Sequence, residues 1–529
     1  MGRSPPLPTL ITFVALCLCI FLVALDTVLI PTALPTIALS FHIQDSLYAW
    51  IGSAYLLANA ASVPFWGKSS DIFGRKPVIM AANVIFLVGS IVCALSMNVS
   101  MLVAGRVVQG FGGGGVVILV HVCVSDLFSI RDRSFYLGML GGVWALASAL
   151  GPVLGGVFAE RLSWRWCFYI NLPIISVSTI ALYTTLRMHN PQTPLLAGVA
   201  SLDWLGTTTI LAAAVLLLVG LQLGCATSFA APLVVTLIIV GCVLHLLFPV
   251  TQWWQERRGR EPVLPLRIFK DVSNLCALGV CACDALAFNS VAYFLPLYLQ
   301  VVLSRSPSMT GIYMLAIAVP LATVSFASGY LINQTGRFVE VLQAGLLFMT
   351  IGVGLLITLS TTRENGRLIP IMFVIGLGFG PNFGAPLIAL QTRIQESDIA
   401  TGTAAFGFVR MVFGALGVVI GQVIFQLLMA PHYDAFVDAG IMPDVAKQLA
   451  RGEAISRART VSAMPPAQSL AIKTSLSRAL RGSWIFYTAI SALGLLVSAG
   501  IKRKKLHRGM GSETPRTLNH RSTADKTEV

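Results

Sequence analysis

The sequence predicts an all-α integral membrane protein. Of its 529 residues, 56% are apolar and only 11% are charged, which is less than half of the roughly 25% that soluble domains carry. So few charges do not cover the polar surface that a soluble chain of this length needs. The ten cysteines are too few for a disulfide scaffold. A net charge of +14 would suggest nucleic acid on a soluble chain, but in a membrane protein the distribution of the charges matters more.

Fourteen stretches of the chain are long and apolar enough to cross a bilayer, which takes about 20 residues of helix. They lack the alternation of apolar and polar residues that marks a transmembrane β-barrel. We therefore predict fourteen transmembrane helices. The fourteen stretches are residues 11–33, 47–67, 77–97, 101–123, 136–158, 167–186, 204–223, 230–250, 274–302, 309–330, 339–360, 368–391, 402–429 and 483–501.

The lysines and arginines predict the orientation of these helices. If the N-terminus is cytoplasmic, the cytoplasmic segments hold 22 of the 36 basic residues, whereas the short outer loops hold five. This excess follows the positive-inside rule, so we expect both termini in the cytoplasm. The cluster Lys502–Lys505 directly follows the last helix. It is suited either to contact with anionic lipid or to a plain stop-transfer role.

A short repeat predicts the internal organisation. The segment Gly67–Lys76 after the second helix and the segment Gly329–Arg337 after the tenth share a glycine, an Asp or Asn four residues later, and Gly-Arg at positions seven and eight. The two positions are equivalent if the helices at 204–223 and 230–250 are an insert. Two parallel six-helix halves imply a transporter that rocks about a central site.

This organisation divides the chain into four parts. They are the N-terminal six-helix half (1–186), a linker with two extra helices (187–272), the C-terminal six-helix half with a long outer loop at 430–482 (273–501), and a basic cytoplasmic tail (502–529).

Several motifs occur in a characteristic order along the chain. They are Leu25–Pro35, Gly67–Lys76, Arg106–Gly112, Gly151–Gly156, Trp164–Pro173 and Asp203–Gly206. With them the sequence resembles the major facilitator superfamily and, within it, the fourteen-helix drug:proton antiporters. The long loop before the last helix is similar to that of fungal toxin and multidrug efflux pumps. The resemblance implies the major facilitator fold, two six-helix halves plus two inserted helices.

The Gly67–Lys76 loop is a candidate cytoplasmic gate. Its glycines permit a tight turn and close helix packing. By resemblance, Asp71 would lie at the positive N-terminal end of the helix that begins near Thr401, and Arg75 could pair with Asp126. Such a latch would hold the cytoplasmic side closed in an outward-open state. The alternative is a solvated turn that only obeys the positive-inside rule. The predicted gate residues are Gly67, Asp71, Gly74, Arg75, Lys76 and Asp126.

A second motif, Gly151-Pro152-x-x-Gly155-Gly156, lies in the fifth helix. Proline kinks a helix, and glycines let another helix pack closely. By resemblance, this motif accompanies antiporters rather than symporters. A packing seam of small residues is the alternative interpretation.

Four ionisable residues lie in the middle of apolar helices: Asp26, Arg106, Asp284 and Arg410. A charge at such a depth costs at least about 2.5–3.5 kcal/mol, so each is a functional candidate. Asp26 and Arg106 lie at matching depths, about 10 and 8 Å from the outer surface. Asp284 and Arg410 could form a second pair. We expect Asp26 to carry the coupled proton, because it belongs to a family motif, with Asp284 as second choice. Static ion pairs are the alternative.

Polar and aromatic residues on the helices expected near the centre are candidates for the substrate cavity, because such residues suit amphipathic organic molecules. Each of them could instead be an ordinary packing residue. The candidates are Gln109, Trp144, Asn289, Tyr293, Asn382 and Gln391.

Together these observations predict a proton-coupled efflux transporter of the plasma membrane that exports a toxin, drug or secondary metabolite by alternating access. The expected partners are the substrate, protons and the lipid bilayer. We expect a monomer without enzymatic activity, cofactor, metal or nucleic acid. The alternatives are a proton-coupled importer of a nutrient or siderophore, and a receptor on the same fold. Asp26, Arg106 and the Gly67–Lys76 loop argue against the receptor, which need not keep a coupling acid.

Overall fold

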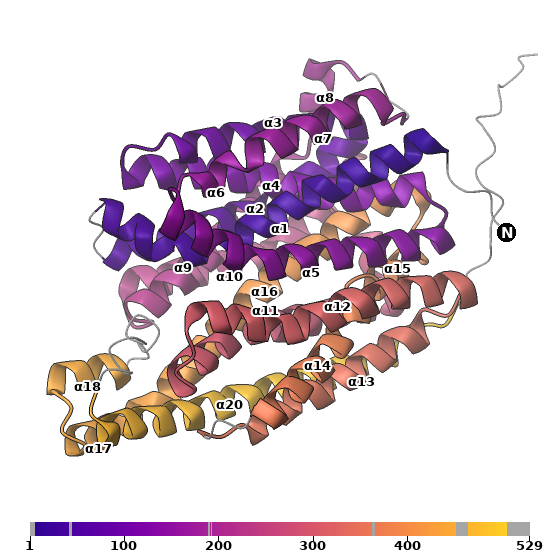
Figure 1. Ribbon diagram of the computed structural model, residues 1–529. Helices are drawn as coiled ribbons and strands as arrows, with labels where there is room; N and C mark the ends of the chain where they lie inside the picture. The colour runs from indigo at the N-terminus through magenta and orange to yellow at the C-terminus, as the bar shows by residue number, and fades with distance from the viewer. Residues whose placement is uncertain are drawn as a thin grey trace, which may run out of the picture.

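The computed structural model describes residues 6–41, 45–188, 191, 193–361, 365–450 and 464–504. Within them the chain is a bundle of long helices (Figure 1). The first half of the bundle contains α1 (Leu7–Phe41), α2 (Asp45–Phe73), α3 (Arg75–Ala94), α4 (Val99–Leu127), α5 (Ile130–Arg161), α6 (Trp166–Tyr169) and α7 (Asn171–Thr185). The last two together form one span.

Next come the short α8 (Leu195–Ser201) and the two inserted helices, α9 (Trp204–Ala226) and α10 (Pro232–Arg257), followed by the 3-10 turn η1 (Leu266–Phe269). The second half contains α11 (Val272–Leu297), the π-helical turn η2 (Tyr298–Val302), α12 (Pro307–Thr335), α13 (Val339–Leu355) with η3 (Leu356–Thr358), α14 (Asn365–Asn382), α15 (Ala385–Gln391), η4 (Glu396–Asp398), α16 (Ile399–Met429) and α20 (Pro466–Ser498).

The structure supports the expected number of spans with one exception. Thirteen helical stretches of the described residues are long and apolar enough to cross a membrane. The one predicted stretch that is not among these thirteen is 47–67. It forms α2, which is 29 residues long but carries Lys68 and Asp71 near its end. The helix therefore has the length of a span and a more polar composition.

The segment 430–482, expected to be an outer loop, contains several short helices. It includes η5 (Ala430–His432), α17 (Tyr433–Asp438) and α18 (Pro443–Ala450), and α17 and α18 project from one end of the bundle (Figure 1). The final helix α20 starts at Pro466, well before the expected residue 483. Residues 451–463 and most of the tail, 505–529, lie outside the described residues.

The two halves repeat the same packing. In the first half α1 packs on α5 and α7, α4 packs on α2 and α3, and α3 packs on α7. The second half has the equivalent contacts: α11 packs on α16 and α20, α14 packs on α12 and α13, and α13 packs on α20. The halves meet along two seams, α5 with α12 and α2 with α16. The inserted helix α9 packs on α10 and also on both α2 and α16, so it lies on one of the seams.

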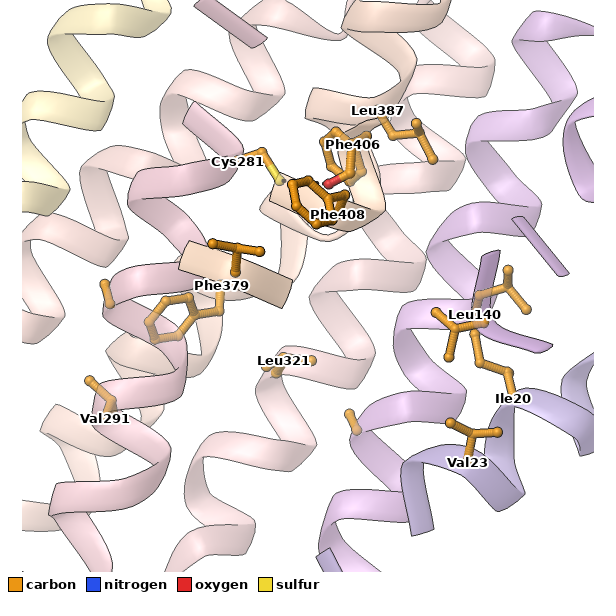
Figure 2. Packing of buried hydrophobic residues seen from close by; sticks show 14 of the residues in the cluster. Ile20, Val23, Leu140, Cys281, Val291, Leu321, Phe379, Leu387, Phe406 and Phe408 are labelled. Carbon is orange, nitrogen blue, oxygen red and sulfur yellow. Dashed lines mark hydrogen bonds between the residues drawn. The ribbon is translucent and has the colours of Figure 1, made fainter. Parts of the chain in front are cut away.

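Apolar side chains fill the interior of each half. Figure 2 shows Ile20 and Val23 of α1 facing Leu140 of α5, and Cys281 of α11 beside Phe406 of α16. Because lipid is as apolar as these side chains, close packing and small residues, rather than exclusion from water, favour helix association here. In α4 this close packing depends on glycine.

Gly112 illustrates the constraint. A Cβ atom at this position would lie 2.4 Å from the backbone nitrogen of Phe86 in α3. We predict that Gly112→Ala destabilises the protein by about 1–3 kcal/mol, because neither backbone can move freely. Gly52 of α2 has no atom within 4 Å of its position for a Cβ, so Gly52→Ala is the matched control. Thermal unfolding of the detergent-solubilised variants tests this, and an equal loss of stability in both would contradict it.

Candidate functional site

Asp26 of α1 and Arg106 of α4 form a buried ion pair. Arg106 Nη1 lies 2.5 Å from Asp26 Oδ2, and both residues are about 1% exposed. The other carboxylate oxygen, Oδ1, accepts hydrogen bonds from Gln109 Nε2 at 3.0 Å and from Asn171 Nδ2 at 3.4 Å. Both oxygens of Asp26 are therefore occupied by donors.

The arginine is equally well satisfied. Arg106 Nε donates to the carbonyl oxygen of Ile51 at 3.1 Å, and Nη1 donates to Gln109 Oε1 at 2.7 Å. Its guanidinium carbon lies 4.2 Å from the centre of the Tyr55 ring. Gln109 also donates to Ser90 of α3 at 2.9 Å. Gln109, a candidate for the substrate cavity, is thus held inside this network and is fully buried.

The second pair, Asp284 of α11 and Arg410 of α16, is much looser. Arg410 Nη2 lies 3.4 Å from Asp284 Oδ2. Among the described residues, Asp284 Oδ1 has no hydrogen-bond partner although it is buried. The Arg410 side chain is 19% exposed, stacks 4.2 Å from the centre of the Phe383 ring and donates to the Phe383 carbonyl. The two intramembrane acids therefore have very different surroundings.

The remaining cavity candidates fall into two groups. Trp144 and Asn289 are partly buried, and Tyr293 is 42% exposed. Asn382 is 1% exposed, and its amide nitrogen donates to the carbonyl of its own helix at Gly378. Gln391 is 3% exposed and belongs to the contacts between the two halves described below.

The end of α2, the start of α3, the end of α4 and the start of α16 meet in a charged latch, at the end of the bundle that we expect to be cytoplasmic. Arg75 Nη1 lies 2.6 Å from Asp71 Oδ1, and Arg75 Nε lies 2.8 Å from Asp126 Oδ2. Thr401, in the first turn of α16, donates to Asp71 Oδ2 at 2.8 Å. Asp71 thus lies at a helix N-terminus, where the helix dipole favours an anion. This contact joins the two halves across the α2–α16 seam.

Close packing accompanies the latch. A Cβ at Gly67 would lie 2.4 Å from the Cβ of Ala404 in α16, so only glycine allows this approach. Gly74, between α2 and α3, has a φ of 90°, which favours glycine. Lys76 does not take part, because its ammonium lies 4.8 Å from the centre of the Tyr183 ring on α7.

The α5–α12 seam is joined in a different way. Arg131 donates to the carbonyl oxygens of Asn333 and Gln334, and Asn333 Nδ2 donates to Asp132 Oδ1 at 2.9 Å. Gln391 adds a third link between the halves, since its Nε2 donates to Ser125 Oγ at 2.9 Å. This end of the bundle, which we expect to face the cytoplasm, is therefore held closed at both seams.

The Gly151–Gly156 motif packs closely on α1 at Gly151. A Cβ at Gly151 would lie 2.9 Å from Val28 Cβ on α1, two residues from Asp26. Gly155 is buried, and Gly156 has open space around it. The side chain of Pro152 lies outside the described part of the structure.

Two further ion pairs were not foreseen from the sequence. Lys68 Nζ lies 2.9 Å from Glu261, and Arg267 makes two hydrogen bonds, 2.6 and 2.7 Å, to Asp398 just before α16. The segment 258–270 that follows the inserted helices is thereby attached to both halves. The sequence did contain a signal for the first of these pairs, because Glu261 is the single acid in that basic segment.

Several known proteins are similar to this chain in sequence or in structure. The family described as Major Facilitator Superfamily matches residues 16–418. Efflux pump dotC of Dothistroma septosporum is 42% identical over 94% of this chain and 84% of its own. The MFS-type transporter ppz2 of Metarhizium majus is 41% identical over 94% and 85%. The structure of the proton:xylose symporter XylE, bound to 6-bromo-6-deoxy-D-glucose, is 14% identical with a TM-score of 0.58, covering 94% of this chain and 96% of that chain.

The Lys68–Glu261 pair makes a testable contribution to stability. The hydrogen bond and charge of Lys68 lower the pKa of Glu261 from its usual 4.5. The stabilisation is therefore complete above the unfolded pKa and is lost as the pH falls through the lower, folded pKa. We predict that wild type is more stable than Glu261→Gln at about pH 7 and that this difference is lost as the pH falls through the lowered pKa of Glu261.

Thermal unfolding over this pH range measures the difference. Asp438→Asn is the control, because Asp438 is an exposed acid of the outer loop without an ion pair among the described residues. A stability difference for Glu261→Gln that does not change with pH would contradict the prediction.

Proposed function

The chain belongs to the major facilitator superfamily, and on that premise we propose that it is a proton-coupled efflux transporter that exports a small organic molecule. It is a multi-pass membrane protein of a transporter family. Relatives named efflux pumps, at up to 42% identity, support export as its direction. The basic residues on one side support cytoplasmic termini, and we place the protein in the plasma membrane.

The observation that carries the proposal is the contrast between the two buried acids. A coupling acid has to alternate between a charged and a neutral form. Protonation of Asp26 would disrupt a network in which both of its oxygens accept hydrogen bonds. Protonation of Asp284 would weaken one contact of 3.4 Å and remove an incompletely satisfied buried charge. We therefore assign the coupled proton to Asp284 rather than to Asp26, our first choice from the sequence.

Arg410 connects this protonation to the movement of the halves. It lies on α16, whose cytoplasmic end carries Thr401 and packs on α2. When Asp284 is protonated from outside, Arg410 loses its counter-ion, and α16 can shift and withdraw Thr401 from Asp71. Release of the proton to the cytoplasm restores the pair and closes the latch.

The Asp26–Arg106 network has a different part in this proposal. It joins α1, α2, α3, α4 and α7 through hydrogen bonds to side chains and to the Ile51 carbonyl. We propose that it keeps the first half rigid while the second half moves against it.

Aromatic side chains near Asp284 indicate the kind of substrate. Phe288 contacts Phe383 edge to face at 5.5 Å, and Asn289 and Tyr293 follow on the same helix with partial exposure. Aromatic walls with few hydrogen-bonding groups suit amphipathic organic molecules.

We predict that Asp284→Asn abolishes efflux driven by a pH gradient, because an amide does not carry the proton. In proteoliposomes it should still exchange labelled for unlabelled substrate, since the binding surfaces remain. The readout is retention of a panel of amphipathic fluorescent dyes in energised cells, followed by the exchange assay for any dye that is exported. Asp26→Asn should instead lower the amount of folded protein, because Arg106 loses its counter-ion.

Two results would contradict these assignments. Normal gradient-driven efflux by Asp284→Asn would exclude Asp284 as the coupling acid. Lower dye accumulation in cells that lack the transporter than in cells that express it would exclude export.

A further inference from the structure

A pocket of about 250 Å³ lies at the cytoplasmic end of the inserted helices. Its walls come from the end of α2, the segment before α9 and the segment after α10. The polar residues that line it include Lys68, Asp203, Gln255, Arg260 and Glu261. At roughly 30 Å³ per water molecule in the liquid, the space suits a small polar group.

One wall of the pocket contains Asp203, whose carboxylate already accepts hydrogen bonds from the protein. Asp203 is 3% exposed and precedes α9. It accepts hydrogen bonds from the backbone of Gly206 at 2.8 Å, from Gln252 at 3.1 Å and from Gln255 at 2.7 Å. Its carboxylate is therefore fully used and does not need a cation from a ligand.

The cations of the pocket are less well satisfied. Lys68 is 4% exposed, and its ammonium pairs with Glu261, whose side chain is 85% exposed. An ammonium has three donors, so donors remain for a second partner. Arg260 is exposed and makes no side-chain hydrogen bond or ion pair with the described residues. One buried ammonium and one unpaired guanidinium at a pocket favour a phosphate group.

The neighbouring residues place the pocket at the level of lipid headgroups. Trp253 and Trp254, near the end of α10, are 45% and 38% exposed. The guanidinium of Arg257 lies 4.0 Å from the centre of the Trp253 ring, and that of Arg258 lies 3.5 Å from Trp254. Exposed tryptophans mark the membrane interface, and arginines near the cytoplasmic surface attract anionic lipids.

We propose that this pocket binds the headgroup of an anionic phospholipid of the cytoplasmic leaflet. Lys68 and Arg260 hold the phosphate, and the acyl chains lie along the exposed apolar side chains of α10, such as Leu246, Leu247 and Val250. The lipid joins α2 to the inserted pair. The inference does not depend on the direction of transport or on proton coupling.

A binding assay tests the proposal on the full chain in detergent micelles. Tail-labelled phosphatidylserine is the probe, with unlabelled phosphatidylserine, phosphatidylcholine and glycerophosphoserine as competitors. We expect phosphatidylserine to compete well and phosphatidylcholine poorly. Arg260→Gln should weaken binding of the probe about tenfold, as for the loss of a charge-assisted contact to phosphate. Arg260 is exposed, so this variant should fold normally.

Arg337→Gln is the matched control, because Arg337 is an exposed arginine on the cytoplasmic side of the other half. It should leave the affinity unchanged. An equal loss in both variants would indicate diffuse attraction by surface charge and overturn the proposal. Equal competition by phosphatidylcholine would overturn the preference for an anionic headgroup. Competition by glycerophosphoserine as strong as that by the lipid would assign the pocket to a soluble phosphate ester instead.

Discussion

A buried arginine determines how the first half of this protein is built. Arg106 is 1% exposed inside a bundle surrounded by hydrocarbon, where a charge without partners is very costly. Asp26 neutralises it, and the Ile51 carbonyl and Gln109 accept from it. These partners come from three helices, α1, α2 and α4. The ion pair and hydrogen bonds of one guanidinium therefore fix the relative positions of these helices. The glycines of α4 allow the close approach that these contacts need.

The second half repeats the packing of the first without repeating this network. Asp284 and Arg410 share one long contact, and the second oxygen of Asp284 has no hydrogen-bond partner among the described residues. The two seams differ in the same way. Asp71 accepts a hydrogen bond from Thr401, whereas Asn333, at the equivalent repeat position, donates to Asp132. A carboxylate at 333 would face another carboxylate, so the amide is required there.

Much of this arrangement could be predicted from the sequence because the bilayer limits the possibilities. Spans need about 20 apolar residues, and depth along a helix placed Asp26 opposite Arg106. Depth does not determine the direction of a side chain around the helix, so Gln109 was expected in the cavity although it points into the network. The start of α20 at Pro466 was missed because its first turns are too polar for an apolar span. Lys68 and Glu261 are 193 residues apart, and no local pattern reports such a contact.

The inserted helices and the segment after them link the two halves at one seam. They lie on the α2–α16 seam, and the segment after them is attached to the first half through Lys68 and to the second through Asp398. Opening this seam lengthens the path between those attachments. The Arg267–Asp398 contact is bidentate and hence the stronger, so the Lys68–Glu261 contact should break first. A largely buried lysine then loses its counter-ion, which opposes opening. The inserted pair therefore favours the state in which this end of the bundle is closed.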